Sequence, residues 1–257
     1  MTKLSPIGIF DSGLGGISIW KGIREELPGE SLIYFGDGLR CPYGNRTENE
    51  VRSFTIEAVE RLLARDCKMI VVACNTATAM AIDDLRERFR EIPIVGLEPA
   101  VKPAALSTST GVIGVLATAR SFDGKLYRHT SSLFQDSVKI LEAVGEGWVE
   151  LVENDMEDTA EAHVAVSRVI EPMLKQGADR LVLGCTHYPF LKKTIGRVIG
   201  SRNVSVVDST RAVSYRVREL LKNAGMLNDS PAKAEYIFQS LLGEEYEKKL
   251  MRKAGVI

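Results

Sequence analysis

The sequence predicts an α/β fold in which two similar parallel-sheet units face each other across one active site. Two short, mainly apolar runs lie at residues 69–73 and 180–184, and each is followed directly by a cysteine and then by small polar residues. Runs this short and this rich in branched aliphatic residues are typical of buried parallel strands rather than helices. Because ligands of open α/β sheets bind at the carboxyl ends of the strands, Cys74 and Cys185 are predicted to lie at the site.

Matched spacings in the two halves indicate an internal repeat. Asp11 follows the first predicted strand and lies 63 residues before Cys74, and Thr118 follows the corresponding strand and lies 67 residues before Cys185. In a parallel sheet, each half would bring a polar side chain and a thiol to the same edge. The repeat therefore predicts two units of similar topology.

The predicted domain boundaries follow the strand that comes after each cysteine. These strands end at Gly96 and Asp208, where the chain is expected to cross between the units. The first domain is predicted to comprise residues 1–97 and 208–257, and the second residues 98–207. The tail from Ser209 to Ile257 is expected to form a helix and terminal elements that return to the first domain.

Strands and helices are predicted to alternate along most of the chain, as in a doubly wound parallel sheet. Thr47 and Glu50 form a capping-box pattern at the start of a long helix, and a glycine-rich turn follows the first strand. Strands are predicted at residues 6–10, 31–35, 69–73, 92–95, 111–116, 138–141, 148–152, 180–184 and 204–207, and helices at 17–27, 47–66, 78–89, 122–134, 159–176 and 191–199.

Composition and charge argue against several classes of partner. The chain of 257 residues has 33 basic and 34 acidic side chains spread along it, so no electrostatic footprint for nucleic acid or an anionic membrane is present. No apolar run approaches the roughly 18 residues of a membrane span, and no signal-peptide core is found, so a cytoplasmic protein is expected. Its four cysteines have wide, irregular spacings, which predicts reduced thiols.

Two thiols at equivalent strand ends suit a reaction that inverts a carbon bearing an acidic hydrogen. One base would remove the proton from one face while its partner protonates the other. A helix N-terminus after each cysteine would favour the thiolate, and the hydroxyls of Thr76 and Thr186 could help to hold a carboxylate. Asp11 and His187 are candidate partners of the two thiols. Each also has a structural explanation, as a turn cap for Asp11 and a satisfied polar group for His187.

Two rival sites would use some of the same residues. Cys74, Cys185 and His187 could supply three zinc ligands. Cys41 or Asp11 would be the fourth, but none of the local zinc spacings is present. The glycine-rich turn resembles a phosphate loop, yet it lacks both standard motifs and its aspartate would repel phosphate. We therefore expect no metal and no nucleotide.

Six short segments add a resemblance to a known family. In chain order they read FDSGLGG at 10–16, CPYG at 41–44, ACNTA at 73–77, GLEP at 96–99, GCTHYP at 184–189 and DS at 208–209. In this combination and order they resemble the cofactor-independent glutamate racemases of bacterial cell-wall synthesis, within the aspartate/glutamate racemase superfamily. The resemblance covers residues 7–221. It implies racemisation of L-glutamate to D-glutamate for peptidoglycan synthesis without a cofactor, and it is compatible with a homodimer.

The resemblance also implies roles for individual residues. Cys74 and Cys185 would be the two acid/base thiols, assisted by Asp11 and His187, with Glu153 as a further acidic residue on the His187 side. The substrate contacts that it implies are Asp11, Ser12, Pro42, Tyr43, Gly44, Asn75, Thr76, Thr118, Ser121 and Thr186.

The chain departs from the family pattern in one segment. Where the family has Gly-Thr-x-x-Thr-Val-x-Ser, residues 117–124 read ATARSFDG, so that Thr118 is kept, Ser121 keeps a hydroxyl and Gly124 replaces a serine. The change bears on affinity and substrate preference rather than on the reaction type. Since one methylene group is worth only about 1–3 kcal/mol of discrimination, aspartate racemisation is the alternative function.

Overall fold

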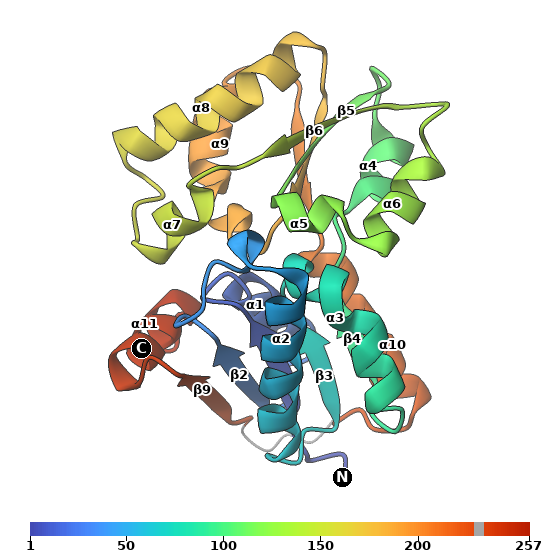
Figure 1. Ribbon diagram of the computed structural model, residues 1–257, viewed down its shortest axis with the longest axis vertical. Coiled ribbons are helices and arrows are strands. Elements are labelled where there is room, and N and C mark those ends of the chain that lie inside the picture. The colour runs from blue at the N-terminus through green and yellow to red at the C-terminus, as the bar shows by residue number, and fades with distance from the viewer. Residues whose placement is uncertain (229–233) are drawn as a thin grey trace. The chain divides into compact units, whose positions relative to one another are not determined.

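The computed structural model describes residues 1–228 and 234–257, which form two compact units. Residues 1–97 and 210–257 make the first unit, and residues 98–209 make the second (Figure 1). Within the second unit, the Ser209 hydroxyl donates a hydrogen bond of 2.6 Å to the Glu98 carbonyl, which joins its two ends. Among the described residues, the helices are all too short or too polar to cross a membrane.

Five parallel strands form the sheet of the first unit, in the order β4-β3-β1-β2-β9. Phe10 pairs with Phe35 on one side and with Val72 on the other, so the carboxyl ends of β1, β2 and β3 meet at one edge. The strands are β1 (Ile7–Asp11), β2 (Leu32–Gly36), β3 (Met69–Val72), β4 (Ile94–Gly96) and β9 (Tyr236–Ser240).

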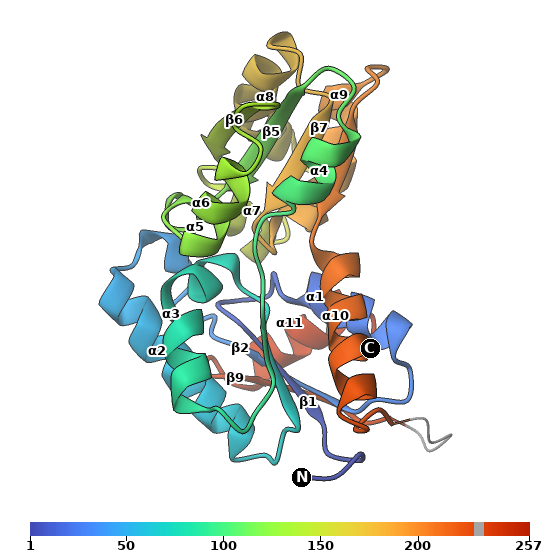
Figure 2. The ribbon, with the colours of Figure 1, turned by 90° about the vertical axis from the view of Figure 1, so that its right-hand side faces the viewer.

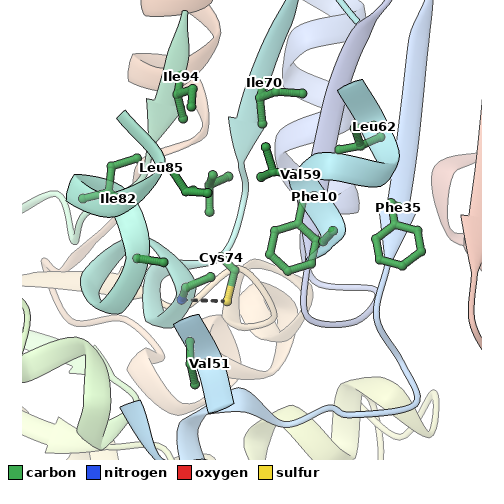
Figure 3. Close-up of a cluster of buried hydrophobic side chains, with 14 of the residues drawn as sticks. Phe10, Phe35, Val51, Val59, Leu62, Ile70, Cys74, Ile82, Leu85 and Ile94 are labelled. Carbon is green, nitrogen blue, oxygen red and sulfur yellow. Dashed lines mark hydrogen bonds between the residues drawn. The ribbon is translucent and has the colours of Figure 1, made fainter. Parts of the chain in front are cut away.

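Helices cover both faces of this sheet (Figures 1 and 2). On one face, α1 (Ile17–Glu26) packs against α10 (Thr210–Asn223) and α11 (Glu244–Ala254). On the other, α2 (Glu48–Leu63) packs against α3 (Asn75–Arg88) over a buried apolar cluster, most of which Figure 3 shows. The predicted capping box of α2 is confirmed: Thr47 Oγ1 accepts from the Glu50 backbone N–H, and the Glu50 carboxylate accepts from that of Thr47.

The tail contains a strand that the sequence analysis did not identify. β9 pairs in parallel with β2 and extends the sheet by one strand. The rings of Tyr236 and Phe238 on this strand each lie 5.2 Å from the Trp20 ring of α1. The edge strand is therefore fixed by aromatic packing as well as by backbone hydrogen bonds.

The second unit has a four-stranded parallel sheet in the order β6-β5-β7-β8. Its strands are β5 (Val112–Ala117), β6 (Lys139–Val144), β7 (Arg180–Gly184) and β8 (Ser205–Asp208). Its helices are α4 (Val101–Ser107), α5 (Ala119–Phe122), α6 (Lys125–Ser132), α7 (Trp148–Glu153), α8 (Ala160–Lys175) and α9 (Lys192–Ile199). In Figure 2, α4 and α6 lie on one face of this sheet and α8 and α9 on the other.

The two sheets share one topology over four strands. The order β2-β1-β3-β4 of the first unit corresponds to β6-β5-β7-β8 of the second. In each, the first strand in sequence lies between the second and the third, and the third strand leads to a cysteine. The prediction of two similar parallel-sheet α/β units is confirmed.

The structure corrects three predicted elements. Residues 148–152 form the helix α7 instead of a strand, because the buried residues Trp148, Val149, Leu151 and Val152 follow helical spacing. Gly147, at a φ of 74°, turns the chain into this helix. The helix predicted at 122–134 is interrupted at Gly124 and forms the short helices α5 and α6. The helix predicted at 78–89 begins earlier, at Asn75.

Candidate active site

Cys74 is the N-cap residue of α3. Its backbone is extended, and its Sγ accepts a hydrogen bond from the Ala77 backbone N–H at 3.4 Å (Figure 3). The side chain is buried. A thiol at this position lies at the positive end of the helix dipole, where the free N–H groups of the first turn favour the thiolate over the neutral thiol.

Asp11 ends β1, and Ser12 begins the turn that follows it, next to Cys74. Asp11 is fully buried, and its Oδ1 accepts a hydrogen bond of 2.8 Å from the Gly13 backbone N–H. Ser12 Oγ lies 3.5 Å from Cys74 Sγ. At Gly16, a Cβ atom would come within 2.6 Å of the Asp11 Cβ, so only glycine lets the chain pass so close to this carboxylate. The turn-cap role expected for Asp11 is present, and it brings Ser12 to the thiol.

Asn75 and Thr76 occupy the first two positions of α3 and are buried. Within the described part of the chain, the Asn75 Nδ2 group is buried and has no hydrogen-bond acceptor. A buried donor without an acceptor is unfavourable by roughly 1–3 kcal/mol, so this amide favours a ligand that brings one. The N-terminus of α3 thus presents a thiol and an unsatisfied amide donor side by side.

The loop after β2 carries Pro42, Tyr43 and Gly44, and Tyr43 begins a short 3-10 helix. The Tyr43 side chain is buried in the same apolar cluster as Cys74. Its hydroxyl donates to Asp37 Oδ2 at 2.6 Å, and Arg40 Nε donates to the same oxygen at 2.6 Å. Neither Asp37 nor Arg40 was predicted as a site residue, because the role of this ion pair depends on contacts that form only in the fold. They fix the loop from inside.

In the second unit, Cys185 follows β7 directly and is buried. Its Sγ lies 3.9 Å from His187 Nδ1, and His187 Nε2 lies 2.7 Å from Glu153 Oε1. Because a neutral imidazole carries its proton on the nitrogen that faces a carboxylate, Nδ1 is left as an acceptor toward the thiol. Cys185, His187 and Glu153 thus lie in consecutive contact, an arrangement in which the imidazole can accept a proton from the thiol or return it.

Packing behind Cys185 explains how Glu153 reaches His187. Glu153 is the last residue of α7, and Trp148 begins that helix. The Trp148 ring meets the Tyr188 ring edge-on, with centroids 4.8 Å apart. This contact ties α7 to the segment that follows Cys185, so the mistaken strand prediction concerned an element that positions the site.

The two thiols differ in their local structure. We predicted a helix N-terminus after each cysteine, but only Cys74 has one. After Cys185 the chain forms a 3-10 helix, Tyr188–Leu191, and α9 begins only at Lys192. His187 occupies the position before the 3-10 helix. The His187 imidazole therefore lies next to Cys185, whereas the N-terminus of α3 lies next to Cys74.

The remaining predicted residues of the second unit lie at the neighbouring strand end. Ala117 pairs with Gly184, so Thr118 and Cys185 each follow one of two paired residues. Thr118 caps α5, and its Oγ1 lies 2.8 Å from Ser121 Oγ. Thr186, next to Cys185, is buried. The changed segment at 117–124 thus still places two hydroxyl groups together, beside the strand that leads to the second thiol.

Fold and site together define a class: a protein of two doubly wound units, each with a buried thiol after its third strand and a polar partner for that thiol. Residues 15–214 match the family model described as Asp/Glu/Hydantoin racemase. A glutamate racemase from Roseiflexus sp. is 42% identical over 224 residues, which are 87% of this chain and 82% of that protein.

Solved structures agree with this match. The crystal structure of a glutamate racemase isoform from Bacillus anthracis is 33% identical, with a TM-score of 0.89 over 99% of this chain and 95% of that one. Escherichia coli glutamate racemase, in complex with L-glutamate and the activator UDP-MurNAc-Ala, is 31% identical, with a TM-score of 0.83 over 96% of this chain and 93% of that one. The chain belongs to the Asp/Glu/Hydantoin racemase family. The family and the enzyme class predicted from the sequence are confirmed.

Proposed function

We propose that this enzyme interconverts L- and D-glutamate without a cofactor, with Cys74 and Cys185 as its two acid/base residues. The observation that carries the proposal is the repeated position of the two thiols: each is buried after the third strand of its sheet and contacts a polar partner. Relatives about 40% identical over most of the chain are glutamate racemases, which supports glutamate as the substrate.

In the proposed reaction, one thiolate takes the hydrogen from Cα as a proton, and the other thiol gives its proton to the opposite face of the carbanion. The first sulfur ends protonated and the second ends as thiolate, so each turnover exchanges their states. The N-terminus of α3 stabilises the Cys74 thiolate, while the His187 and Glu153 pair serves Cys185. Asp11 assists on the Cys74 side.

Substrate binding in this proposal uses groups near each thiol. The amino group of glutamate is held by Asp11 and Ser12. The unsatisfied Asn75 amide and the hydroxyls of Thr76 and Thr186 bind carboxylate oxygens. The further proposed contacts are Pro42, Tyr43 and Gly44 in the first unit, and Thr118 and Ser121 in the second.

The proposed product has a defined use. D-Glutamate would supply peptidoglycan synthesis, and hence cell-wall formation and cell shape, from the cytoplasm, where thiols stay reduced. A homodimer is compatible with this proposal.

The proposal is tested by following circular dichroism of L-glutamate with purified enzyme, a chelator and no added cofactor. We expect the signal to decay to zero as the racemate forms, and kcat/KM for L-glutamate to exceed that for L-aspartate by at least about tenfold. Turnover only after zinc or a nucleotide is added would contradict the proposal. Faster turnover of aspartate would replace glutamate by the alternative substrate.

A further inference from the structure

A fully buried carboxylate, Asp37, lies in the loop that carries the proposed substrate contacts at residues 42–44. Burying a charge is unfavourable unless it is paired and hydrogen-bonded. The Asp37 Oδ2 atom accepts from both Arg40 Nε and the Tyr43 hydroxyl, each at 2.6 Å. This carboxylate is therefore kept in the interior by two partners from its own loop.

Arg40 connects this carboxylate to α2. Its Nη1 donates to Glu57 Oε2 at 2.7 Å, and its guanidinium carbon lies 4.2 Å from the centre of the Phe54 ring. Both residues lie on α2, which starts at Glu48, beyond the loop. The Asp37 carboxylate is thus held against a rigid element, and Tyr43 is held against the carboxylate.

The Tyr43 ring connects the carboxylate to the thiol. It packs 6.1 Å from the Phe10 ring and 5.9 Å from the Phe54 ring, in the cluster that also contains Cys74. Burial raises the pKa of Tyr43, as do the Asp37 charge and the hydrogen bond to it, so the phenol stays protonated and gives its one proton to Asp37. The hydroxyl is thereby fixed, and only the backbone and the ring of Tyr43 are left to face a ligand.

Asp179 in the second unit shows how a purely structural buried carboxylate differs. Both of its oxygens are used at the amino ends of the strands, by the Thr108 hydroxyl and by the backbone N–H groups of Ser109 and Thr110. At Asp37, by contrast, Oδ1 is buried without a hydrogen-bond partner among the described residues. The side chains that bond Asp37 come from the loop of the proposed substrate contacts, whereas the groups that bond Asp179 come from a segment with no proposed contact.

We propose that Asp37 is a positioning residue of the active site: held by Arg40, it fixes the Tyr43 hydroxyl and thereby holds loop 42–44 over Cys74. This inference rests on the proposed function, in which the loop contacts glutamate. It assigns Asp37 no contact with the substrate and no proton transfer.

The test compares Tyr43→Phe, Asp37→Asn and the double variant with Asp179→Asn as the matched control. Tyr43→Phe removes the charge-assisted hydrogen bond and Asp37→Asn removes its charge, so we expect each single variant to raise KM for both glutamate enantiomers, by about tenfold in Tyr43→Phe, while kcat changes less than about threefold. The double variant should have about the KM of the more strongly affected single variant, since both changes break the same link. Asp179→Asn should leave KM unchanged.

A second measurement does not depend on turnover. Iodoacetamide labelling of the folded protein, followed by peptide mass spectrometry, reports the reaction rates of Cys74 and Cys185 separately. We expect Tyr43→Phe and Asp37→Asn to speed alkylation of Cys74 several-fold and to leave that of Cys185 unchanged. If Asp37→Asn does not fold, the result for Tyr43→Phe, which retains the aromatic ring, is sufficient to test the proposed role of Asp37.

The outcomes separate the two proposals. An inactive wild-type enzyme overturns the proposed function, whereas the alkylation rates still decide the role of Asp37. Unchanged KM and unchanged Cys74 labelling in Tyr43→Phe overturn that role. So do single effects that multiply in the double variant, or an equal rise in KM in Asp179→Asn.

Discussion

His187 and Glu153, 34 residues apart in the chain, are joined by a contact of 2.7 Å between Nε2 and Oε1. Glu153 ends α7, and His187 lies beyond β7, so the contact depends on how these elements pack in the second unit. It turns the other ring nitrogen, Nδ1, toward Cys185. The second thiol therefore has an imidazole and a carboxylate beside it, where the first has a helix N-terminus.

This difference predicts unequal effects of two substitutions on the two directions of the reaction. In the proposed mechanism each thiol must be a thiolate in one direction only. His187→Asn should therefore lower kcat about 10²–10⁴-fold in the direction that needs the Cys185 thiolate, and less in the other. Asp11→Asn should show the opposite preference. Initial rates with each pure enantiomer measure both.

The Haldane relation fixes the ratio of the two kcat/KM values, so the asymmetry has to appear in kcat and KM separately. Glu153→Gln is a milder change than His187→Asn, because it keeps a hydrogen-bond acceptor for His187 but removes the negative charge. We expect it to follow His187→Asn with a smaller loss. Equal losses of every parameter in both directions would mean that these side chains only hold the site together.

Asp179 predicts a pH-dependent contribution to stability. Burial alone would raise the pKa of this carboxyl group, but hydrogen bonds from Thr108, Ser109 and Thr110, together with the Arg180 charge, hold its pKa below the usual range. A folded-state pKa below the unfolded value of about 3.9 stabilises the protein above that pH, and the contribution is lost as the pH falls through the folded value.

Asp179→Asn should therefore lower the free energy of unfolding at pH 7 by roughly 1–3 kcal/mol, with a difference from wild type that shrinks below about pH 4. Urea unfolding monitored by tryptophan fluorescence measures it. The comparison is Thr159→Ala, which removes the cap of α8 and affects hydrogen bonds to the backbones of Met156 and Ala162, so its effect on stability should not depend on pH. A difference that stays constant down to pH 3 would assign the loss to packing.

Cys67 provides an internal standard for thiol reactivity. It is fully buried, and burial raises the pKa of its thiol to about 12. At pH 8 roughly one molecule in ten thousand would carry the thiolate, so iodoacetamide should leave Cys67 unmodified in the folded enzyme and label it after denaturation. Labelling of Cys67 as fast as that of Cys74 would show that the native fold opens under the conditions of the assay.

Local sequence patterns were enough to predict the strands that carry the thiols. The runs before Cys74 and Cys185 are mainly apolar on both faces, and polar residues follow each cysteine. This change in polarity was enough to predict where each strand ends. The repeat was also visible, because equal topologies require similar spacings. The family motifs then supplied the residue roles that no spacing could supply.

Features that depend on tertiary packing were missed. The five residues from Trp148 are too few to separate a strand pattern from a helix pattern, and the contact of the Trp148 ring with the Tyr188 ring exists only in the fold. Asp37 gives no signal in the sequence, because its importance comes from burial next to Tyr43. The difference between the two thiols was hidden as well: both precede predicted helices, yet only after Cys74 does the α-helix start at the next residue.

The sharpest prediction concerns the source of the proton that the product receives. If Cys74 and Cys185 act on opposite faces of Cα, the proton taken from L-glutamate stays on one sulfur, and the other delivers a proton that has exchanged with solvent. In D2O, early D-glutamate should carry deuterium at Cα while unreacted L-glutamate remains almost unlabelled. A single base that reaches both faces would label substrate and product together. NMR of the Cα proton at low conversion, with each enantiomer as starting material, distinguishes the two.

Single-thiol variants complete this test. Cys74→Ala and Cys185→Ala should each lose racemisation by at least about 10³-fold, because removing one of two groups that act as a unit abolishes the whole step. Each variant should still be able to exchange the Cα hydrogen of the one enantiomer whose proton faces the remaining thiol, and the two variants should prefer opposite enantiomers. The serine variants, which keep the size but not the acidity of the thiol, separate loss of the base from loss of packing. Racemisation at near wild-type rates in either alanine variant would show that the paired-thiol mechanism is wrong.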